Sequence, residues 1–153
     1  MIDDTQAMNR CIELAAISAR KGNHPFGALI ALNGEIIAEG ENCVITELDP
    51  AGHAEVAAIR NACRALGTRE LNGATLYTSC EPCLLCSTEI RLVGISRVVY
   101  AATSPGGYGG DTSIFPVLRV DTIARVGAPP EIVAGFMAEP SAAMWRELGW
   151  PAT

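Results

Sequence analysis

No apolar run in this sequence approaches the length that a membrane-spanning helix needs, so we expect no membrane segment. The start, Met1 to Thr5, lacks the basic region and the apolar stretch of a signal peptide, and we therefore expect a cytoplasmic protein. No internal repeat, linker or second domain is evident, which predicts one domain over residues 1–153. A disordered chain is excluded as well, because 49% of the residues are hydrophobic and only 18% are charged.

Basic charge is also scarce. The 11 Lys and Arg residues stand against 17 Asp and Glu residues, which gives a net charge of −6, and no run of basic residues occurs. Because clustered positive charge is what binds a phosphate backbone, this balance argues against nucleic acid as a partner, although a local basic patch can survive in an acidic protein. The 6 cysteines are spread along the chain and fit a reducing compartment better than a disulfide framework.

Periodicity and turn residues predict alternating strands and helices. The expected strands cover 28–32, 35–39, 74–79, 97–102 and 132–136, and the expected helices cover 3–21, 53–66, 82–93, 113–118 and 141–148. The pair Asn33-Gly34 is preferred in tight hairpin turns, and Pro82 suits the first position of a helix. A hairpin followed by crossover units predicts an α/β fold, a three-layer α/β/α sandwich with a mixed sheet.

Two short stretches carry the candidate chemistry: Gly52-His53-Ala54-Glu55 and Ser79-Cys80-Glu81-Pro82-Cys83-Leu84-Leu85-Cys86. A zinc ion that does chemistry takes three protein ligands and keeps a fourth position for water, and His53, Cys83 and Cys86 make three. The two cysteines are three residues apart at a helix start, where the helix dipole favours thiolates. Glu55 faces another side of its helix and is expected to carry protons instead of binding the metal. The pattern predicts one catalytic zinc ion per chain.

Other interpretations of the cysteines remain open. Cys80 extends the spacing toward a bacterial iron–sulfur motif, but the fourth cysteine of that motif is missing, and a small buried residue is expected instead. A dithiol redox protein at Cys83 and Cys86 would leave His53 and Glu55 without a role. A zinc-binding module without catalysis is the remaining alternative.

Several polar positions outside the two stretches have structural explanations. His24 precedes Pro25 in a turn and is expected to be solvated or hydrogen-bonded locally, not a metal ligand. Asn42 stands at a strand end, where asparagine commonly forms turns. The glycine-rich loop 104–110 lacks the residue order of a phosphate-binding loop, so a flexible lid fits it better. Asp111 is placed to cap the helical turn that follows it.

The combination of His-x-Glu with Pro-Cys-x-x-Cys is the signature of zinc nucleobase deaminases, and the chain resembles the cytidine-deaminase-like superfamily from about Pro25 to Phe115. The matching stretches are 25–28, 39–42, 49–55 and 76–83. Several of them are shared with tRNA adenosine deaminases. Thr-Ser-Cys before Glu-Pro-Cys is similar to the bacterial guanine deaminases, and so is Asp111 followed by Ser113 and Ile114.

This resemblance implies particular substrate contacts and an assembly. It implies that Asn42 hydrogen-bonds the base, that Phe26 lines the pocket, and that Asp111 binds or protonates the base. Trp145 resembles the aromatic tail that closes the guanine pocket, but the chain ends without the tyrosine-bearing end of that family. The family also implies a homodimer with exchanged C-terminal segments.

We therefore expect zinc-dependent hydrolytic deamination of a free nucleobase, guanine to xanthine, with release of ammonia. Water activated by zinc would attack the ring carbon that bears the amino group, while Glu55 relays the proton. Other free bases or nucleosides, such as cytosine, isocytosine and cytidine, come next as substrates, and adenosine in tRNA comes last.

Overall fold

The computed structural model describes residues 1–103 and 127–150, and these residues contain a five-stranded sheet in the order β2-β1-β3-β4-β5. β1 pairs antiparallel with both β2 and β3, whereas β3 pairs parallel with β4 and β4 with β5. The strands are β1 (Gly27–Leu32), β2 (Glu35–Glu41), β3 (Thr75–Cys80), β4 (Arg97–Ala102) and β5 (Glu131–Val133). The predicted mixed sheet is confirmed. The predicted loop 104–110 and helical turn 113–118 lie outside the described residues.

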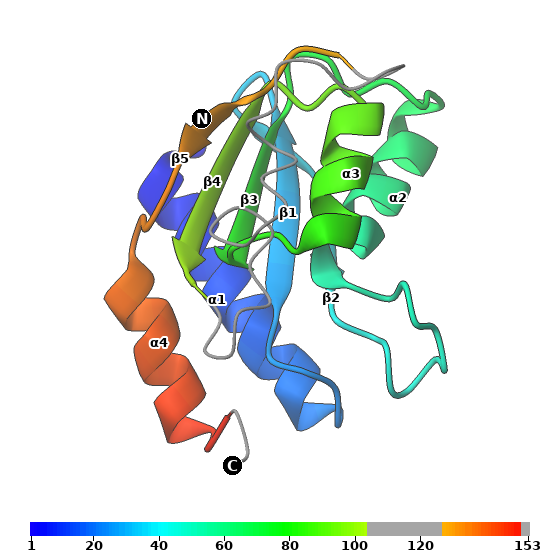
Figure 1. Cartoon of the computed structure of the whole chain (residues 1–153). Coiled ribbons are helices and arrows are strands. Elements are labelled where there is room, and N and C mark those ends of the chain that lie inside the picture. The colour runs from blue at the N-terminus through cyan, green and yellow to red at the C-terminus, as the bar shows by residue number, and fades with distance from the viewer. Residues whose placement is uncertain (104–126, 151–153) are drawn as a thin grey trace.

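Helices cover both faces of the sheet (Figure 1). One face carries α1 (Asp4–Arg20) and α4 (Ala138–Glu147), and the other carries α2 (Ala54–Leu66) and α3 (Leu84–Leu92). Apolar side chains fill the space on each side: Ile59 and Ile90 pack on Leu76 of one face, while Met8 packs with Tyr77 of the other. The predicted three-layer α/β/α sandwich is confirmed.

Local sequence explains where these elements begin and turn. The Asp3 carboxylate accepts a hydrogen bond from the Gln6 N–H (2.7 Å) and the Gln6 side chain accepts one from the Asp3 N–H (3.1 Å), which caps the start of α1. Asn33 (φ 54°) and Gly34 (φ 81°) form the tight turn between β1 and β2, as predicted. Among the described residues, no helix combines the length and the apolar character needed to cross a membrane.

Glycine lets β2 approach α2 closely. A Cβ atom on Gly40 would lie 2.3 Å from the carbonyl oxygen of Ala54 and 2.4 Å from the amide nitrogen of Ala58, both in the backbone of α2. No side chain fits in that space. The first turn of α2 is therefore held directly on the sheet, and this turn is the one that presents the candidate catalytic residues.

Two predicted helix starts were wrong by a few residues. Pro82 is not the first residue of α3, because Cys83 has an extended backbone (φ −72°, ψ 176°) and the helix begins at Leu84. α4 begins at Ala138 and not at Ser141, since Pro140 is tolerated within the first turn, where its missing N–H has no helical partner.

Candidate active site

The candidate metal ligands stand at the starts of two helices. His53 is the N-cap residue of α2 (φ −71°, ψ 152°) and Cys83 is the N-cap residue of α3. N-cap side chains usually bond to the first-turn amides of their own helix, but neither of these two makes such a bond. Both side chains are thus available to meet each other between α2 and α3.

His53, Cys83 and Cys86 come together at this point. The Nδ1 atom of His53 lies 3.3 Å from the Sγ of Cys83 and 3.4 Å from the Sγ of Cys86. The three ligand atoms all lie within 4.8 Å of one another. Two sulfurs and one imidazole nitrogen are a donor set that suits zinc, and three protein donors leave a fourth position for water. Cys80 is not part of this cluster within the described residues.

The two cysteines of the cluster differ in their readiness to ionise. A hydrogen bond from Cys86 lowers the pKa of the Cys83 thiol to about 4, with a further contribution from His53. The same interaction with Cys83, together with burial, raises the pKa of Cys86. Cys83 is therefore the readier of the two thiols to ionise, and a bound cation would favour ionisation of both.

Glu55 lies beside the cluster and is almost fully buried. Its Oε1 accepts a hydrogen bond from the Thr78 hydroxyl (2.8 Å), and its Oε2 lies 3.4 Å from the Sγ of Cys86. Burial raises the pKa of the Glu55 carboxyl above its ordinary value, and the negative charge of Cys83 adds to this effect. A carboxyl with a raised pKa next to a metal site is suited to accept and return protons.

A cavity of about 540 Å³ opens in front of these groups, a size within the range of small-molecule sites. Glu55, His53 and Cys83 belong to its polar part. Phe26 and Trp150 line the cavity as well, with their rings 5.0 Å apart in an edge-to-face arrangement. The cavity thus combines a reactive polar end with aromatic walls that suit a flat ring.

The residues implied as substrate contacts fall in different places. Asn42 and Phe26 both line the cavity, and Asn42 is 3% exposed. Trp145 is buried and packs edge-on against Phe26 at 6.0 Å, while its Nε1 donates to the carbonyl oxygen of Pro25 (2.9 Å). It is not among the described residues that line the cavity. Asp111 lies outside the described residues.

Trp150 and Thr78 are contributors to the site that sequence reasoning missed. Trp150 lines the cavity although it follows α4 near the end of the chain, and nothing local in the sequence places it there. Thr78 holds Glu55 through its hydroxyl, and the only available signal was a threonine within an otherwise buried strand. α4 packs against β3 and β4, which brings Trp150 to the cavity.

A family model agrees with this geometry. The model described as the cytidine and deoxycytidylate deaminase zinc-binding region matches residues 1–102, which include His53, Glu55, Cys83 and Cys86. The matched region also contains the Phe26 and Asn42 positions of the cavity wall.

Similar proteins include two kinds of deaminase. The tRNA-specific adenosine deaminase of Bacillus subtilis (strain 168) is 37% identical over 152 residues, which cover 97% of this chain and 92% of the relative. The guanine deaminase of the same organism is 48% identical over 96 residues, 62% of each protein. A structure solved in studies of A-to-I editing by tRNA:A34 deaminases superimposes with a TM-score of 0.81 at 33% identity and covers 92% of this chain and 99% of that chain.

Proposed function

This chain belongs to the cytidine and deoxycytidylate deaminase zinc-binding family, and from this premise we propose that it deaminates a free nucleobase, with guanine as the first substrate. The reaction is hydrolytic and converts guanine to xanthine with release of ammonia. The identity of 48% with a guanine deaminase over 96 residues supports this choice. The Thr-Ser-Cys-Glu-Pro-Cys stretch at residues 78–83 supports it as well.

The charge of the cavity wall is the observation that carries the proposal. None of the described residues that line the cavity is a lysine or an arginine, while Glu55 and Glu81 contribute carboxylates. Outside the cavity, Arg10 and Lys21 are paired with carboxylates of the chain itself. A substrate that carries phosphate needs positive charge nearby, so this wall suits an uncharged ring.

His53, Cys83 and Cys86 are the residues that we propose to hold the zinc ion. Zinc supplies the activation of water, because it lowers the pKa of water from about 15.7 toward 7. The His53 imidazole would bind the ion in its neutral form, with the Nδ1 atom that faces both sulfurs, and the two thiols would bind as thiolates. Side chains that line the cavity carry out the proton transfers and bind the substrate.

Glu55 is the proposed proton carrier. It takes one proton from the attacking water and passes it to the ring nitrogen, and it then moves the proton of the added hydroxyl group to the leaving amino group. A C–O bond forms at the ring carbon, the C–N bond to the amino group breaks, and the ring keeps a carbonyl group. The hydrogen bond from Thr78 fixes one oxygen of the carboxylate, so that the other oxygen faces the cluster.

Asn42 and the aromatic residues are the proposed substrate contacts. The Oδ1 of Asn42 accepts a hydrogen bond from the Val44 N–H (3.2 Å), which fixes its amide, and its Nδ2 has no partner among the described residues. This amide group is thus available to a carbonyl oxygen or ring nitrogen of the base. Phe26 and Trp150 are the proposed aromatic wall beside the ring. Asp111 and Trp145 stay predictions as substrate contacts.

Adenosine in tRNA is the second candidate substrate. Similarity to a tRNA-specific adenosine deaminase over 97% of this chain favours it. Recognition of tRNA requires contacts with phosphates, and such contacts make activity fall steeply with salt. Salt dependence therefore separates the two candidates.

An ammonia-release screen of the zinc-loaded protein tests the proposal. Guanine, isocytosine, cytosine, cytidine and a tRNA anticodon hairpin are offered as substrates. We expect the highest turnover with guanine, and little change between about 50 and 200 mM salt, because no phosphate contact is displaced. Turnover of the hairpin with none on free bases would overturn the proposal.

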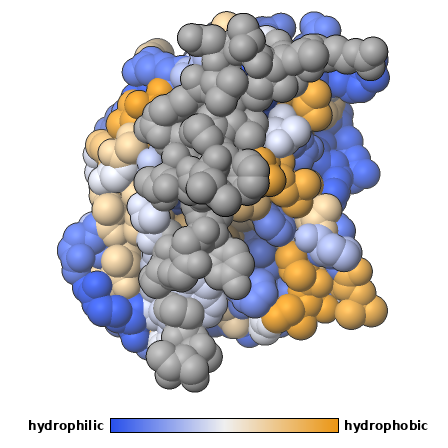
Figure 2. Space-filling model, in the orientation of Figure 1, coloured by the Kyte–Doolittle hydropathy of each residue, from blue (hydrophilic) through white to orange (hydrophobic). Residues whose placement is uncertain are grey.

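We also propose that the chain is one deaminase domain over residues 1–153 and that it forms a homodimer. Hydrophobic side chains gather over the loop between β2 and α2 (Figure 2), where Ile45 and Leu48 are 51% and 88% exposed. Leu84 and Leu85 at the start of α3 are exposed as well. Exposed apolar groups of this kind mark interaction surfaces. Light scattering on a sizing column should give twice the mass of one chain.

A further inference from the structure

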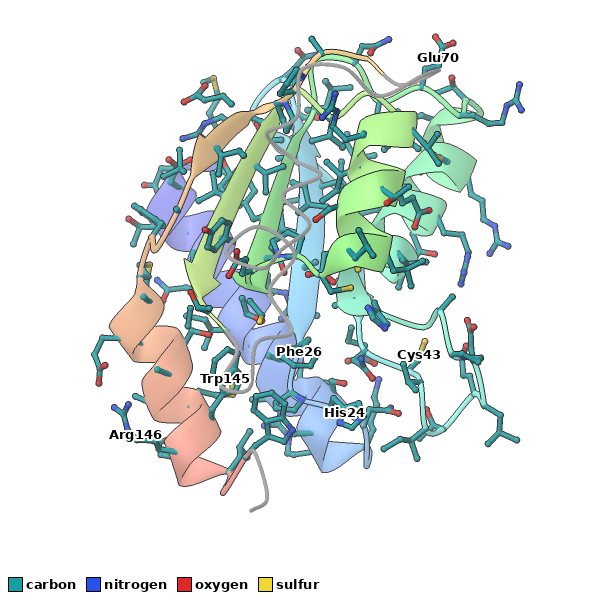
Figure 3. All side chains as sticks on the ribbon, viewed as in Figure 1. His24, Phe26, Cys43, Glu70, Trp145 and Arg146 are labelled. Atoms are coloured by element: carbon teal, nitrogen blue, oxygen red, sulfur yellow. The ribbon has the colours of Figure 1, made fainter. Side chains whose placement is uncertain are left out.

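His24 is exposed, as its position before a proline predicted, and it also lies at the cavity. It follows α1 in the short segment that leads into β1, and its side chain lines the same cavity as Glu55 and Asn42. Figure 3 shows His24 close to Phe26, whereas Glu70 lies at the opposite end of the molecule. The His24 and Phe26 ring centroids are 6.5 Å apart.

The backbone around His24 is held firmly. Its carbonyl oxygen accepts a hydrogen bond from the Phe26 N–H (2.9 Å), and it lies 2.9 Å from the buried Ser18 hydroxyl. The next carbonyl, of Pro25, accepts the hydrogen bond from Trp145. The imidazole of His24 is therefore attached to a segment whose backbone is fixed by hydrogen bonds.

The backbone of Asn42 is held by the same segment. The Ser18 hydroxyl lies 2.7 Å from the carbonyl oxygen of Asn42, and the Asn42 N–H donates to the carbonyl oxygen of Phe26 (3.1 Å). The backbone of His24 and that of Asn42 thus keep a constant separation at the cavity. Polar side chains on two backbone segments at a constant separation can contact two positions on one rigid ring.

His24 also offers unused hydrogen-bonding capacity. Two other polar groups of the wall already have partners, since Glu55 is bonded by Thr78 and His53 faces Cys83. The imidazole of His24 has no hydrogen-bond partner among the described residues. Neutral imidazole carries one donor and one acceptor, so it can bond either a ring N–H or a carbonyl group of a ligand.

We propose that His24 is a substrate-binding residue that selects heteroaromatic rings with a polar edge, through one hydrogen bond from its imidazole. The inference rests on the proposed function, since it assigns a further contact for the same free-base substrate. A contact of this kind is made equally in the ground state and the transition state, so its loss raises KM and leaves kcat unchanged.

Two substitutions separate a hydrogen bond from simple ring packing. His24→Phe keeps a flat ring but removes both polar atoms, and His24→Gln keeps a donor and an acceptor. We expect His24→Phe to raise KM for guanine about three- to tenfold with kcat within twofold of wild type, the effect of one neutral hydrogen bond. His24→Gln should recover at least half of the loss, and the remote Glu70→Ala should match wild type.

Binding is measured separately from turnover. Equilibrium dialysis of guanine against zinc-loaded Glu55→Gln protein, with and without His24→Phe, should show the same three- to tenfold loss of affinity. An unchanged KM in His24→Phe, or an equal loss in His24→Phe and His24→Gln, overturns the inference while the proposed function stands. Absence of ammonia release from guanine and isocytosine by the wild type overturns both.

Discussion

Glu55 is buried, and a hydrogen bond holds one oxygen of its carboxylate. The Thr78 hydroxyl bonds one carboxylate oxygen, and the other oxygen faces the Cys86 thiol. A first-turn glutamate that merely complemented the dipole of α2 would contribute up to about 1 kcal/mol and would have no reason to be buried. The environment instead matches that of a proton carrier.

Substitution of Glu55 by glutamine tests this role. The amide keeps the size and the hydrogen bond from Thr78 but cannot carry a proton. General acid–base catalysis contributes about 10²–10⁴ in rate, and one carboxylate serves several transfers here, so kcat should fall by about 10⁴ or more. Zinc content by metal analysis should stay at one per chain.

Glu89 offers a matched control for this substitution. It is a half-buried glutamate of α3 whose pKa is also raised by burial, but it does not line the cavity. Glu89→Gln should work within about threefold of wild type. Glu55→Gln activity within tenfold of wild type would remove Glu55 from the mechanism.

The three neighbouring cysteines make a second test at the residue scale. Cys83→Ala and Cys86→Ala each remove one ligand atom of the cluster, whereas Cys80→Ala removes a buried thiol that lies outside it. We expect the first two variants to lose zinc on dialysis and Cys80→Ala to retain one zinc per chain, measured by mass spectrometry of the metal. Equal loss in all three would point to a different ligand set.

At the scale of elements, the short-range patterns predicted most of the structure. The hairpin at Asn33-Gly34 and the mixed sheet follow from turn chemistry and from strand and helix periods, and both are confirmed. The cluster of His53, Cys83 and Cys86 was predictable because each motif stands directly before or within the first turn of a helix. The spacing of residues within each short motif was therefore enough to predict the cluster.

The remaining parts of the site depend on contacts between distant segments. Trp145 bonds Pro25 across 120 positions of sequence, and Trp150 reaches the cavity only because α4 packs beside β4. Helical period identifies α4 as a helix but does not say which face of the sheet it covers. His24 was placed in a turn correctly, yet the cavity beside it is formed by other elements.

The packing of β2 on α2 gives a prediction at this scale. Gly40→Ala would place a methyl group 2.3 Å from the Ala54 carbonyl oxygen, so α2 must move away from the sheet. Overpacking of this kind costs about 1–3 kcal/mol, and the shift also displaces His53 and Glu55 at the start of α2. Urea unfolding should show the lost stability, and zinc affinity should fall with it.

Gly127 provides the control for Gly40. A Cβ atom there meets nothing within 4 Å, and its backbone has no positive φ. Gly127→Ala should therefore leave the urea midpoint and the zinc content unchanged. The same midpoint for Gly40→Ala and Gly127→Ala would show that β2 and α2 are not packed as closely as the distances indicate.

On the scale of the whole molecule, the first helix is tied to the far strands by one polar cluster. Arg97 of β4 donates from its two terminal nitrogens to the two carboxylate oxygens of Asp4, both at 2.8 Å, and the Tyr77 hydroxyl donates to the same carboxylate (2.7 Å). These contacts join the start of α1 to β3 and β4, and the chain after β3 leads to Cys83 and Cys86. The contacts among Asp4, Arg97 and Tyr77 therefore link the N-terminal helix to the centre of the sheet.

Removal of the Asp4 charge should weaken this link in a pH-dependent way. The hydrogen bonds from Arg97 are the main reason that the pKa of Asp4 falls from 3.8 to about 2. A lowered pKa means that the carboxylate stabilises the fold above about pH 4 and loses this contribution as the pH falls toward 2. Because the side chain is 34% exposed, solvent screening limits the effect of Asp4→Asn at pH 7 to about 1 kcal/mol of unfolding free energy.

Urea unfolding of wild type and Asp4→Asn at pH 7, 4.5 and 3 measures this difference, and any change common to both proteins cancels at each pH. The gap in unfolding free energy should be similar at pH 7 and 4.5, and smaller at pH 3, where part of the wild-type carboxylate is protonated in the unfolded chain. Glu139→Gln is the control, since its pair with Arg146 is exposed on both sides and such pairs contribute little. A gap that does not shrink at pH 3 would mean that Asp4 stabilises the start of α1 through its shape and hydrogen bonds, and not through its charge opposite Arg97.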